Sequence, residues 1–355
     1  MKILSVVGAR PQFIKLGPLS RELRKNHEEI IIHTGQHYDH EMSDLFFEQL
    51  EIPKPNVNLA IGSGRHGTQT GQMLAGIEKE IIRHQPDMVL SFGDTNSTLA
   101  ACLAAAKLEV PSLHIEAGLR SFNRSMPEEI NRIVADHTAD LLFAPTEAAV
   151  RHLRNEGLEP KTVLTGDIMA DSVQFVQIKI TGNKYLNRIY YLLTMHRPYN
   201  VDDPEKLRML FTSLAKLNQD IVFPIHPRTR SIVEMHRIVI PENVELIKPQ
   251  GYIEFQGLIK NAEKIITDSG GLQKEAYIAG KPCITLRPET EWVETVDAGW
   301  NQLLDITDPE LAEKIDSFNP SGERPDLYGS NVAKRMVGEI ERFFGIASSD
   351  VGVSR

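Results

Sequence analysis

The chain of 355 residues contains only two cysteines, Cys102 and Cys283, and each lies within an apolar segment. Cysteines in such surroundings are typical of small core residues, so we expect neither a disulfide framework nor a cysteine metal site. No apolar run approaches the ~20 residues that a membrane-spanning helix needs. The first strand-like run is short and no signal peptide is evident, so the expected location is the cytoplasm, with no membrane partner.

The chain also has fewer basic than acidic residues, with 39 Lys and Arg and 48 Asp and Glu, which gives a net charge of -9. A protein that binds a phosphate backbone needs a basic face, so we expect no nucleic-acid partner. The first apolar run is not followed by Gly-x-Gly-x-x-Gly, and the sequence has no His-Glu-x-x-His spacing. We therefore expect no nicotinamide or other cofactor and no metal.

What the sequence does contain is a regular alternation of short apolar runs and helix-length amphipathic stretches. This alternation is typical of βαβ repetition with a parallel sheet, and the length is sufficient for two domains. In the first half, the predicted strand and helix pairs are 3–7 with 12–25, 29–33 with 40–50, 87–92 with 97–107, 111–115 with 127–138, and 140–144 with 146–156.

A polar segment without a strong period, 174–188, is interpreted as a linker to a second series of the same kind. The fold class is therefore α/β, with two Rossmann-like domains. We expect domains at 1–172 and 173–335. A helix is predicted near 329–345. The segment 336–355, which includes the end of this helix and a frayed tail, is expected to pack back on the first domain. The predicted strands of the second half are 189–194, 221–225, 244–247, 264–267 and 282–286.

Three acids lie at the ends of predicted strands or at the start of a helix. Asp94 follows the apolar run 88–92, Glu116 follows the next run, and Glu128 comes directly after Pro127. The carboxyl edge of a parallel sheet is where open α/β folds bind ligands, and carboxylates gathered there suggest proton chemistry. We expect Glu116 to be partly desolvated, which would raise its pKa toward values useful in catalysis.

Simpler interpretations exist for these acids. Asp94 is well placed to cap the helix expected near Ser97, a role that is compatible with binding a ligand. Glu128 lies four residues before Arg132 on the same helix face. A surface ion pair between the two would therefore explain both residues without a catalytic role.

Two glycine-containing turns are candidate anion sites. In the segment 8–15, a glycine turn exposes backbone N–H groups at a helix start, and Arg10 and Lys15 add positive charge. The segment 268–275 offers Ser269, two glycines and a helix N-terminus, a suitable phosphate cradle, while Glu275 could accept hydrogen bonds from sugar hydroxyls. Either segment could instead be an ordinary strand-to-helix turn.

Two histidines, His196 and His226, end successive predicted strands of the second half. A single loop histidine is more often structural or solvated. Two at neighbouring strand ends favour a functional role, because imidazole titrates near neutral pH.

Together these motifs resemble the non-hydrolysing UDP-N-acetylglucosamine 2-epimerases. The resemblance covers nearly the whole chain, and its motifs occur in the family's order: Gly-Ala-Arg-Pro-Gln-Phe-Ile-Lys at 8–15, Thr-Gly-Gln-His at 34–37, Gly-Asp-Thr-Asn-Ser at 93–97, His-Ile-Glu-Ala-Gly-Leu-Arg at 114–120, Pro-Glu-Glu-Ile-Asn-Arg at 127–132, His-Arg at 196–197, His-Pro-Arg at 226–228, Thr-Asp-Ser-Gly-Gly at 267–271 and Glu-Thr-Glu-Trp at 289–292. The family implies a glycosyltransferase-B-like architecture, two Rossmann-like domains around a cleft for a UDP-sugar, and usually a homodimer.

The chemistry implied by the family is inversion at C2 of the sugar without an oxidising cofactor. A base removes the C2 proton, UDP leaves from C1, a 2-acetamidoglucal forms, and UDP adds back after reprotonation from the other face. By motif match, the catalytic residues would be Asp94, Glu116, Glu128 and His196, with the choice of base and acid left open. The residues expected to bind substrate are Arg10, Lys15, Arg132, His226, Ser269, Gly270, Gly271 and Glu275.

Two departures from the family pattern stand out. Tyr199 replaces the carboxylate of the usual His-Arg-x-Glu-Asn stretch, which puts local supporting contacts in doubt. The bacterial regulatory pocket for a second UDP-sugar uses a Gln-His loop. Here Gln36 and His37 are present but 38–42 differs in spacing, so activation by substrate stays open.

The segments 8–13 and 120–123 also look like the family branch that acts on UDP-2,3-diacetamido-glucuronate. A uronate needs an additional cation near C6, which Arg120, Arg124 or Arg197 could supply. The motifs are also compatible with a hydrolysing relative, a glycosyltransferase of the same architecture or a catalytically inactive UDP-sugar-binding regulator. The intact acids weigh against the inactive regulator.

Overall fold

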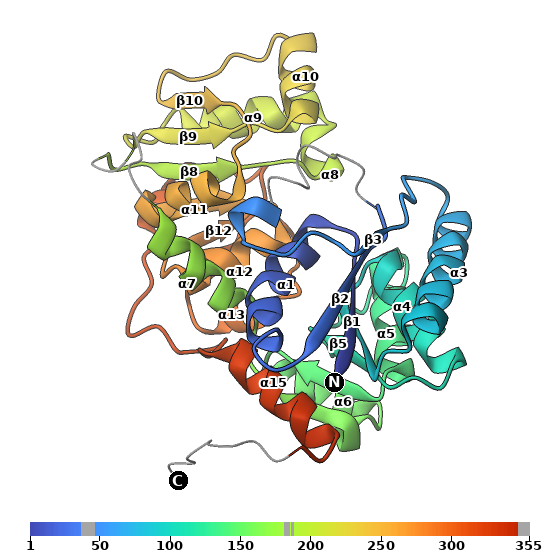
Figure 1. Ribbon diagram of the computed structural model, residues 1–355. Helices are drawn as coiled ribbons and strands as arrows, with labels where there is room; N and C mark the ends of the chain where they lie inside the picture. Colours follow the sequence, from blue (N-terminus) through green and yellow to red (C-terminus); the bar gives the residue numbers. More distant parts are fainter. Residues whose placement is uncertain (37–46, 181–184, 186–187, 347–355) are drawn as a thin grey trace. The chain divides into compact units, whose positions relative to one another are not determined.

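The computed structural model describes residues 1–36, 47–180, 185 and 188–346, and the chain forms two compact units (Figure 1). The first unit contains 1–172 and 327–355, and the second contains 173–326. The second unit thus ends at Asp326, whereas the sequence prediction places the end of the second domain at 335. The chain rejoins the first unit earlier than predicted, at residue 327, because two of the residues that follow are bonded to that unit. Tyr328 O accepts the Asp167 N–H at 2.9 Å, and the Val332 N–H bonds to Asp171 at 3.1 Å.

In the described residues, the first unit is built on a sheet of seven parallel strands in the order β3-β2-β1-β4-β5-β6-β7. The strands are β1 (Lys2–Val7), β2 (Glu28–His33), β3 (Val57–Asn58), β4 (Met88–Phe92), β5 (Ser112–Ile115), β6 (Leu141–Ala144) and β7 (Thr162–Leu164). The order reverses between β1 and β4, which is the point where such sheets bind ligands. The five longer strands were predicted, whereas β3 and β7, of two and three residues, are too short to produce a pattern.

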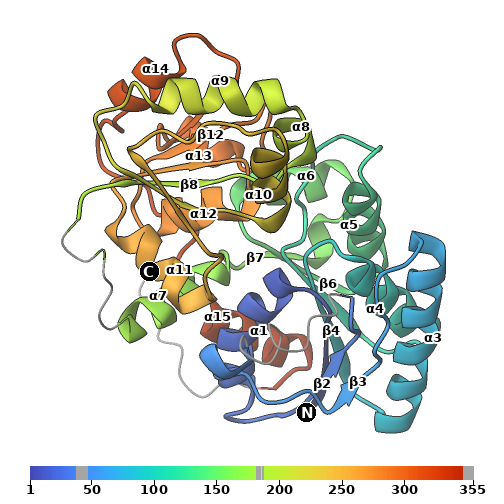
Figure 2. The ribbon, with the colours of Figure 1, turned by 90° about the horizontal axis from the view of Figure 1, so that it is seen from above.

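Helices cover both faces of this sheet. Within the part of the first unit that the structure describes, they include α1 (Arg10–Leu23), α3 (His66–His84), α4 (Asn96–Lys107), α5 (Pro127–Thr138), α6 (Glu147–Asn155) and α15 (Val332–Phe343). The helices α3, α4 and α5 lie side by side in Figure 2, and α3 and α4 pack on one face of the sheet through apolar side chains. The C-terminal helix α15 lies against α1 (Figure 1).

The predicted linker at 174–188 is wrong over its first part, because the helix α7 (Met169–Lys179) occupies it. Met169, Val173 and Val176 are buried at helical spacing, and the Asp167 carboxylate accepts the Met169 N–H at 2.8 Å. The polar residues between them obscure this period in the sequence. The helix α3 was also missed, since few of its positions are apolar and buried.

Some predictions fall outside the described residues. These are most of the helix expected at 40–50, the altered loop 38–42, the centre of the expected linker at 181–184, and the tail 347–355.

The second unit repeats the architecture, and its described residues form six parallel strands in the order β10-β9-β8-β11-β12-β13. The strands are β8 (Tyr191–Thr194), β9 (Ile221–Pro224), β10 (Val244–Ile247), β11 (Lys264–Thr267), β12 (Cys283–Thr285) and β13 (Asn301–Leu303). All but β13 were predicted. The order here reverses between β8 and β11, so a second ligand-binding edge is expected at their carboxyl ends.

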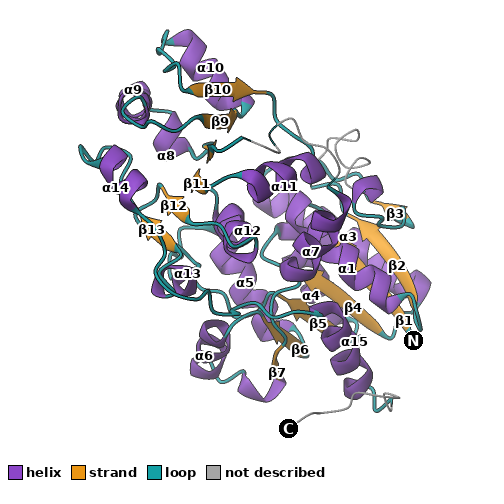
Figure 3. Cartoon of the chain, turned by 90° about the vertical axis from the view of Figure 1, so that its left-hand side faces the viewer, coloured by secondary structure: helices purple, strands orange, loops and turns teal. Residues whose placement is uncertain are grey.

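Both faces of this second sheet are buried, which explains why its strands appear as continuous apolar runs. Its helices are α8 (Pro198–Val201), α9 (Pro204–Leu214), α10 (Pro227–Met235), α11 (Tyr252–Asn261), α12 (Gly270–Ile278), α13 (Val293–Asp297) and α14 (Leu311–Ser317). Tyr191 and Leu193 pack with α9 and α14, whereas Tyr190 and Leu192 pack with α11 and α12 on the opposite face (Figure 3).

Among the described residues, no helix combines the length and the apolar character that crossing a bilayer requires.

Candidate functional site

The turn after β5 holds Glu116 in an unusual backbone conformation. Its φ of 71° lies in the left-handed region, which costs a residue with a side chain about 1–3 kcal/mol. The neighbouring peptides hold the turn in place, since Ile115 O accepts the Gly93 N–H at 2.9 Å and the Ala117 N–H bonds to Phe143 O at 3.0 Å. The side chain of Glu116 is 11% exposed and pairs with the Lys15 ammonium. The strained turn therefore directs a nearly buried carboxylate onto a lysine of α1.

Gly93, at the end of β4, leaves room for this ion pair. Its φ is 63°, and a Cβ at this position would lie 3.2 Å from Glu116 Oε2 and 3.3 Å from Lys15 Nζ. Glycine is thus favoured both by the backbone conformation and by the close approach of two charged groups. Gly8, at the end of β1, is similar, because a Cβ there would clash with the hydroxyls of Thr34 and Ser97.

Asp94 comes next, and its carboxylate pairs with the Arg132 guanidinium. The interpretation of Asp94 as a helix cap is wrong. Thr95 is the capping residue of α4, and its hydroxyl accepts the Thr98 N–H. The Asp94 side chain is about one-third exposed, so it can reach a ligand while its cationic partner orients it.

The ion pair between Glu128 and Arg132, which was the simpler alternative to a functional role, does not form. Arg132 donates instead to Glu129 Oε2 at 2.7 Å, and Glu129 is 1% exposed. Glu128 lies exposed in the first turn of α5, and its side chain makes no hydrogen bond or ion pair to the residues that the structure describes. The two adjacent glutamates thus differ in environment, and Glu128 remains accessible.

Glu129 is a supporting residue that the sequence analysis missed. Its carboxylate accepts hydrogen bonds from the Ser121 N–H at 3.0 Å, the Ser121 hydroxyl at 2.9 Å and the Phe122 N–H at 2.9 Å. Burial alone would raise the pKa of Glu129, but these donors and Arg132 hold it below its ordinary value. Glu129 therefore links the loop after β5 to the arginine that holds Asp94.

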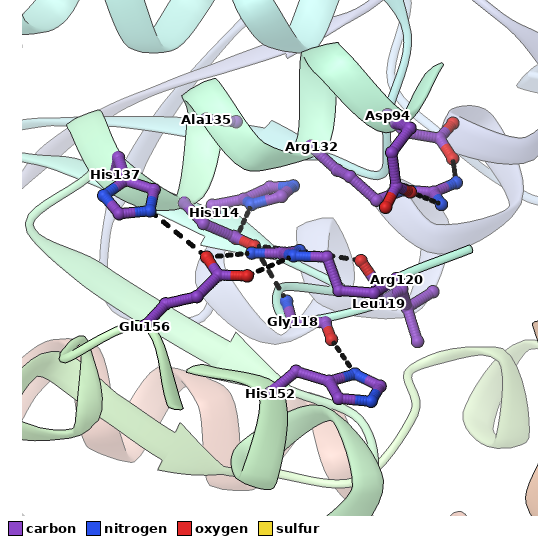
Figure 4. A network of polar contacts seen from close by, with 12 residues as sticks. Asp94, His114, Gly118, Leu119, Arg120, Arg132, Ala135, His137, His152 and Glu156 are labelled. Atoms are coloured by element: carbon purple, nitrogen blue, oxygen red, sulfur yellow. Dashed lines mark hydrogen bonds and ion pairs between the residues drawn. The ribbon is translucent and has the colours of Figure 1, made fainter. Parts of the chain in front are cut away.

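Arg120 is not available as a cation for a uronate, contrary to one sequence hypothesis. Its side chain is buried, with Nη1 2.7 Å from Asp136 Oδ2, and its Nε and Nη2 bond to Glu156 at 2.7 and 2.8 Å (Figure 4). Burial would lower the pKa of the Arg120 guanidinium, but the two carboxylates hold it above its ordinary value. Of the other candidates, Arg124 is exposed and Arg197 is half-buried.

Gln12 is a second residue that the sequence analysis missed. Its side-chain oxygen accepts the Gly8 N–H at 2.7 Å, and its amide nitrogen donates to Phe92 O at 2.8 Å and to the Thr95 hydroxyl at 3.0 Å. This buried side chain ties the turn after β1 to the turn after β4. Arg10 lies nearby in the chain, exposed at the start of α1.

In the second unit, the carboxylate of Asp268 organises the turn that follows β8. It accepts the backbone N–H of His196 at 3.1 Å and that of Arg197 at 2.9 Å, and it is fully buried. The His196 Nδ1 lies 3.5 Å from Asp268 Oδ1, and the His196 side chain is 40% exposed. Burial lowers the pKa of the His196 imidazole, although Asp268 opposes the shift.

The Tyr199 substitution leaves the arrangement around Asp268 in place. Asn200, the neighbouring member of the motif, donates to Asp268 Oδ2 at 3.3 Å and to Leu286 O at 2.9 Å. Tyr199 itself is 47% exposed and lies near Arg287, and partial burial raises the pKa of its phenol. The supporting contacts that were in doubt are therefore made by Asn200 and Asp268.

His226, which follows β9, has a local structural role. Its Nδ1 accepts the Arg228 N–H at 3.2 Å and so caps α10. Its ring centroid lies 6.1 Å from that of His196, so the two predicted histidines do come together.

The segment from Ser269 to Gly271 lies at the start of α12, where the sequence analysis places a candidate anion cradle. The Ser269 N–H bonds to the Thr267 hydroxyl at 2.9 Å, and no side-chain cap from Ser269 covers the helix start. A Cβ at Gly270 would clash with Glu291 Oε1, so any larger residue there would displace the Glu291 carboxylate. Farther along α12, Glu275 accepts a hydrogen bond from the buried Gln256 amide at 2.6 Å.

No group of three or more potential metal ligands occurs within the part of the chain that the structure describes.

Comparisons with known proteins agree on one family. The family model for UDP-N-acetylglucosamine 2-epimerase matches residues 21–341. A UDP-N-acetylglucosamine 2-epimerase homolog from Methanococcus maripaludis is 50% identical over 335 residues, covering 91% of this chain and 94% of the relative. The UDP-2,3-diacetamido-2,3-dideoxy-D-glucuronate 2-epimerase of Pseudomonas aeruginosa is 46% identical over 351 residues, covering 96% of this chain and 99% of that protein.

Solved structures give the same result. The Methanocaldococcus jannaschii UDP-GlcNAc 2-epimerase, crystallised with UDP-GlcNAc and UDP, has a TM-score of 0.86 and 41% identity, with 97% of this chain and all of that chain covered. The calicheamicin glycosyltransferase CalG4 shares the fold alone, at a TM-score of 0.56 and 14% identity, over 98% of this chain and 99% of its own. The predicted fold class, α/β with two Rossmann-like units of glycosyltransferase-B type, is confirmed. The chain belongs to the UDP-N-acetylglucosamine 2-epimerase family.

Proposed function

We propose that this protein is a non-hydrolysing UDP-N-acetylglucosamine 2-epimerase, an isomerase that interconverts UDP-GlcNAc and UDP-ManNAc. The observation that carries the proposal is the strained turn at Glu116 after β5, which directs a carboxylate onto Lys15, while the turn after the neighbouring strand β4 carries the Asp94–Arg132 pair. Strain of this kind persists where the surroundings over-determine it, commonly at functional sites. Further support comes from a relative in this family whose structure was solved with UDP-GlcNAc and UDP.

In this proposal the reaction eliminates UDP from the sugar and adds it back. The C2 proton of the sugar is weakly acidic, so its removal is coupled to departure of the nucleotide, whose charge must be stabilised. Asp94, Glu116 and Glu128 are the groups that remove and return the proton. Glu116 pairs with the Lys15 ammonium and Asp94 with the Arg132 guanidinium, so a fixed cation orients each carboxylate.

The nucleotide is assigned to two groups of residues. Ser269, Gly270 and Gly271 would hold the diphosphate at the start of α12, where free backbone N–H groups and the helix dipole favour an anion. Glu275 would accept hydrogen bonds from sugar hydroxyls. The further contacts with the UDP-sugar are assigned to Arg10, Lys15, Arg132, His196 and His226.

A second candidate function is epimerisation of UDP-2,3-diacetamido-glucuronate by the same mechanism. It is favoured by the 46% identity to the Pseudomonas aeruginosa enzyme of that name. The additional cation that a uronate needs would have to be Arg124 or Arg197, because Arg120 is committed to Asp136 and Glu156.

Turnover of the two nucleotide sugars by the purified protein, followed by NMR, tests these proposals. Conversion of UDP-GlcNAc to UDP-ManNAc supports the first, and conversion of the uronate alone supports the second. Accumulation of free UDP with free sugar would indicate hydrolysis and would refute both.

We also propose a cytoplasmic homodimer. Sedimentation equilibrium that gives the mass of one chain, 39.9 kDa, would refute the dimer.

A further inference from the structure

His114, on β5, is fully buried and bonded through both of its ring nitrogens. Nδ1 lies 2.7 Å from Asp136 Oδ1, and Nε2 lies 2.6 Å from Gly93 O. A carboxylate and a carbonyl oxygen can only accept, so both nitrogens must donate. The hydrogen-bond pattern therefore makes His114 an imidazolium, a cation with no access to solvent.

The positive charge of His114 is balanced within the same network (Figure 4). Asp136 Oδ2 accepts the Gly118 N–H at 3.1 Å and lies 2.7 Å from Arg120 Nη1, and Arg120 pairs with Glu156. Burial would raise the pKa of Asp136, but His114 and Arg120 hold it below its ordinary value. The buried charges of this network are thus paired, His114 and Arg120 with Asp136, and Arg120 also pairs with the partly exposed Glu156.

This network connects the two turns that carry the proposed catalytic acids. The Gly93 carbonyl, held by His114, belongs to the residue directly before Asp94. The Gly118 N–H, held by Asp136, lies two residues after Glu116. A change in the His114–Asp136 pair would therefore shift the two carboxylates relative to each other.

We propose that His114 is a positioning residue for the epimerisation, whose imidazolium acts with Asp136 to set the separation between the Asp94 and Glu116 carboxylates. This inference rests on the function proposed above. It differs from a purely structural role, because it predicts a loss of turnover in protein that is fully folded.

The test is the variant His114→Gln, which keeps a donor for one of the two acceptors and removes the charge. A misplacement of about 1 Å costs about 10²-fold in rate, so we expect kcat to fall by about 10²-fold while KM changes less than about threefold. The matched control is His27→Gln. His27 is also nearly buried, its side chain 4% exposed, and is bonded to a carboxylate, Glu341, at 3.1 Å, but it lies away from both turns. This control should lower the Tm and leave kcat unchanged.

Both variants are assayed well below their Tm, with circular dichroism as the measure of folding. If folded His114→Gln keeps a kcat within about threefold of the wild type, the proposal is overturned. A second measurement uses the wild-type protein, so it does not depend on whether a variant folds. In wild-type protein labelled with ¹⁵N-histidine, a buried ring with two N–H signals at pH 7.5 is the expected result, and a ring with one N–H at this position would overturn the proposal. Wild-type protein inactive on both sugars would refute the proposed function instead, while the ring signals would still report the imidazolium.

Discussion

Replacing Gly93 by alanine should reduce turnover far more than the accompanying loss of stability can explain. The φ of 63° imposes a backbone cost of about 1–2 kcal/mol on any residue with a Cβ. In addition, the new methyl group would lie 3.2 Å from Glu116 Oε2 and 3.3 Å from Lys15 Nζ. Such contacts are tighter than van der Waals packing allows, so the ion pair must move by a few tenths of an ångström.

The backbone cost can be separated from the effect on the site by a matched variant, Gly157→Ala. Gly157 has a φ of 77° and belongs to the same unit, but a Cβ there would meet no atom within 4 Å. Both variants should therefore lose about 1–2 kcal/mol of stability, which is about 2–4 °C in Tm for each kcal/mol in a unit of this size.

Turnover should distinguish the two variants. Displacement of a positioned catalytic group by less than 1 Å should cost about tenfold or more in kcat for Gly93→Ala, equivalent to about 1.4 kcal/mol of activation free energy. Gly157→Ala should keep the wild-type kcat. Equal turnover by the two variants, measured below both Tm values, would refute the role assigned to the room beside Gly93.

Three further predictions concern single residues. Glu116→Gln should lower turnover by about 10²-fold or more while UDP binding, measured by calorimetry, remains; near-normal turnover would remove Glu116 from the mechanism. The folded-state pKa of His196 is lowered by burial, so its neutral form contributes stability above the ordinary pKa of about 6.5 that is lost as pH falls. The Tm of His196→Gln should consequently fall less than that of the wild type on acidification below pH ~6.5, and parallel Tm–pH curves would contradict this. Tyr199→Glu, at a half-exposed position, should change the free energy of unfolding by less than about 0.5 kcal/mol in denaturant titrations, and a larger loss would show that Tyr199 supports the turn.

The longer strands could be predicted because each is buried on both faces, so its apolar run is continuous. The positions of Asp94 and Glu116 followed from the same fact, since both residues come just after such a run. The helices α7 and α3 could not be predicted as easily. In α7, buried positions such as Val173 and Val176 are separated by polar residues, and tertiary packing rather than a clear period defines the helix.

Side-chain partners were the least predictable part of the site. Glu128 and Glu129 are adjacent in the first turn of α5, and spacing alone did not show which would reach Arg132. The burial of Arg120 depends on Asp136 and on Glu156, which lies 36 residues away. Contacts over such separations are set by the packing of the folded chain, which a single sequence does not reveal.

We infer that the acids at the ends of β4 and β5 remove and return the proton at C2 of the sugar. NMR of UDP-GlcNAc incubated with the protein in D₂O measures this proton transfer most directly. We predict deuterium at C2 of the UDP-ManNAc formed, and strongly reduced incorporation with Glu116→Gln. Product that retains the original C2 hydrogen would contradict the claim.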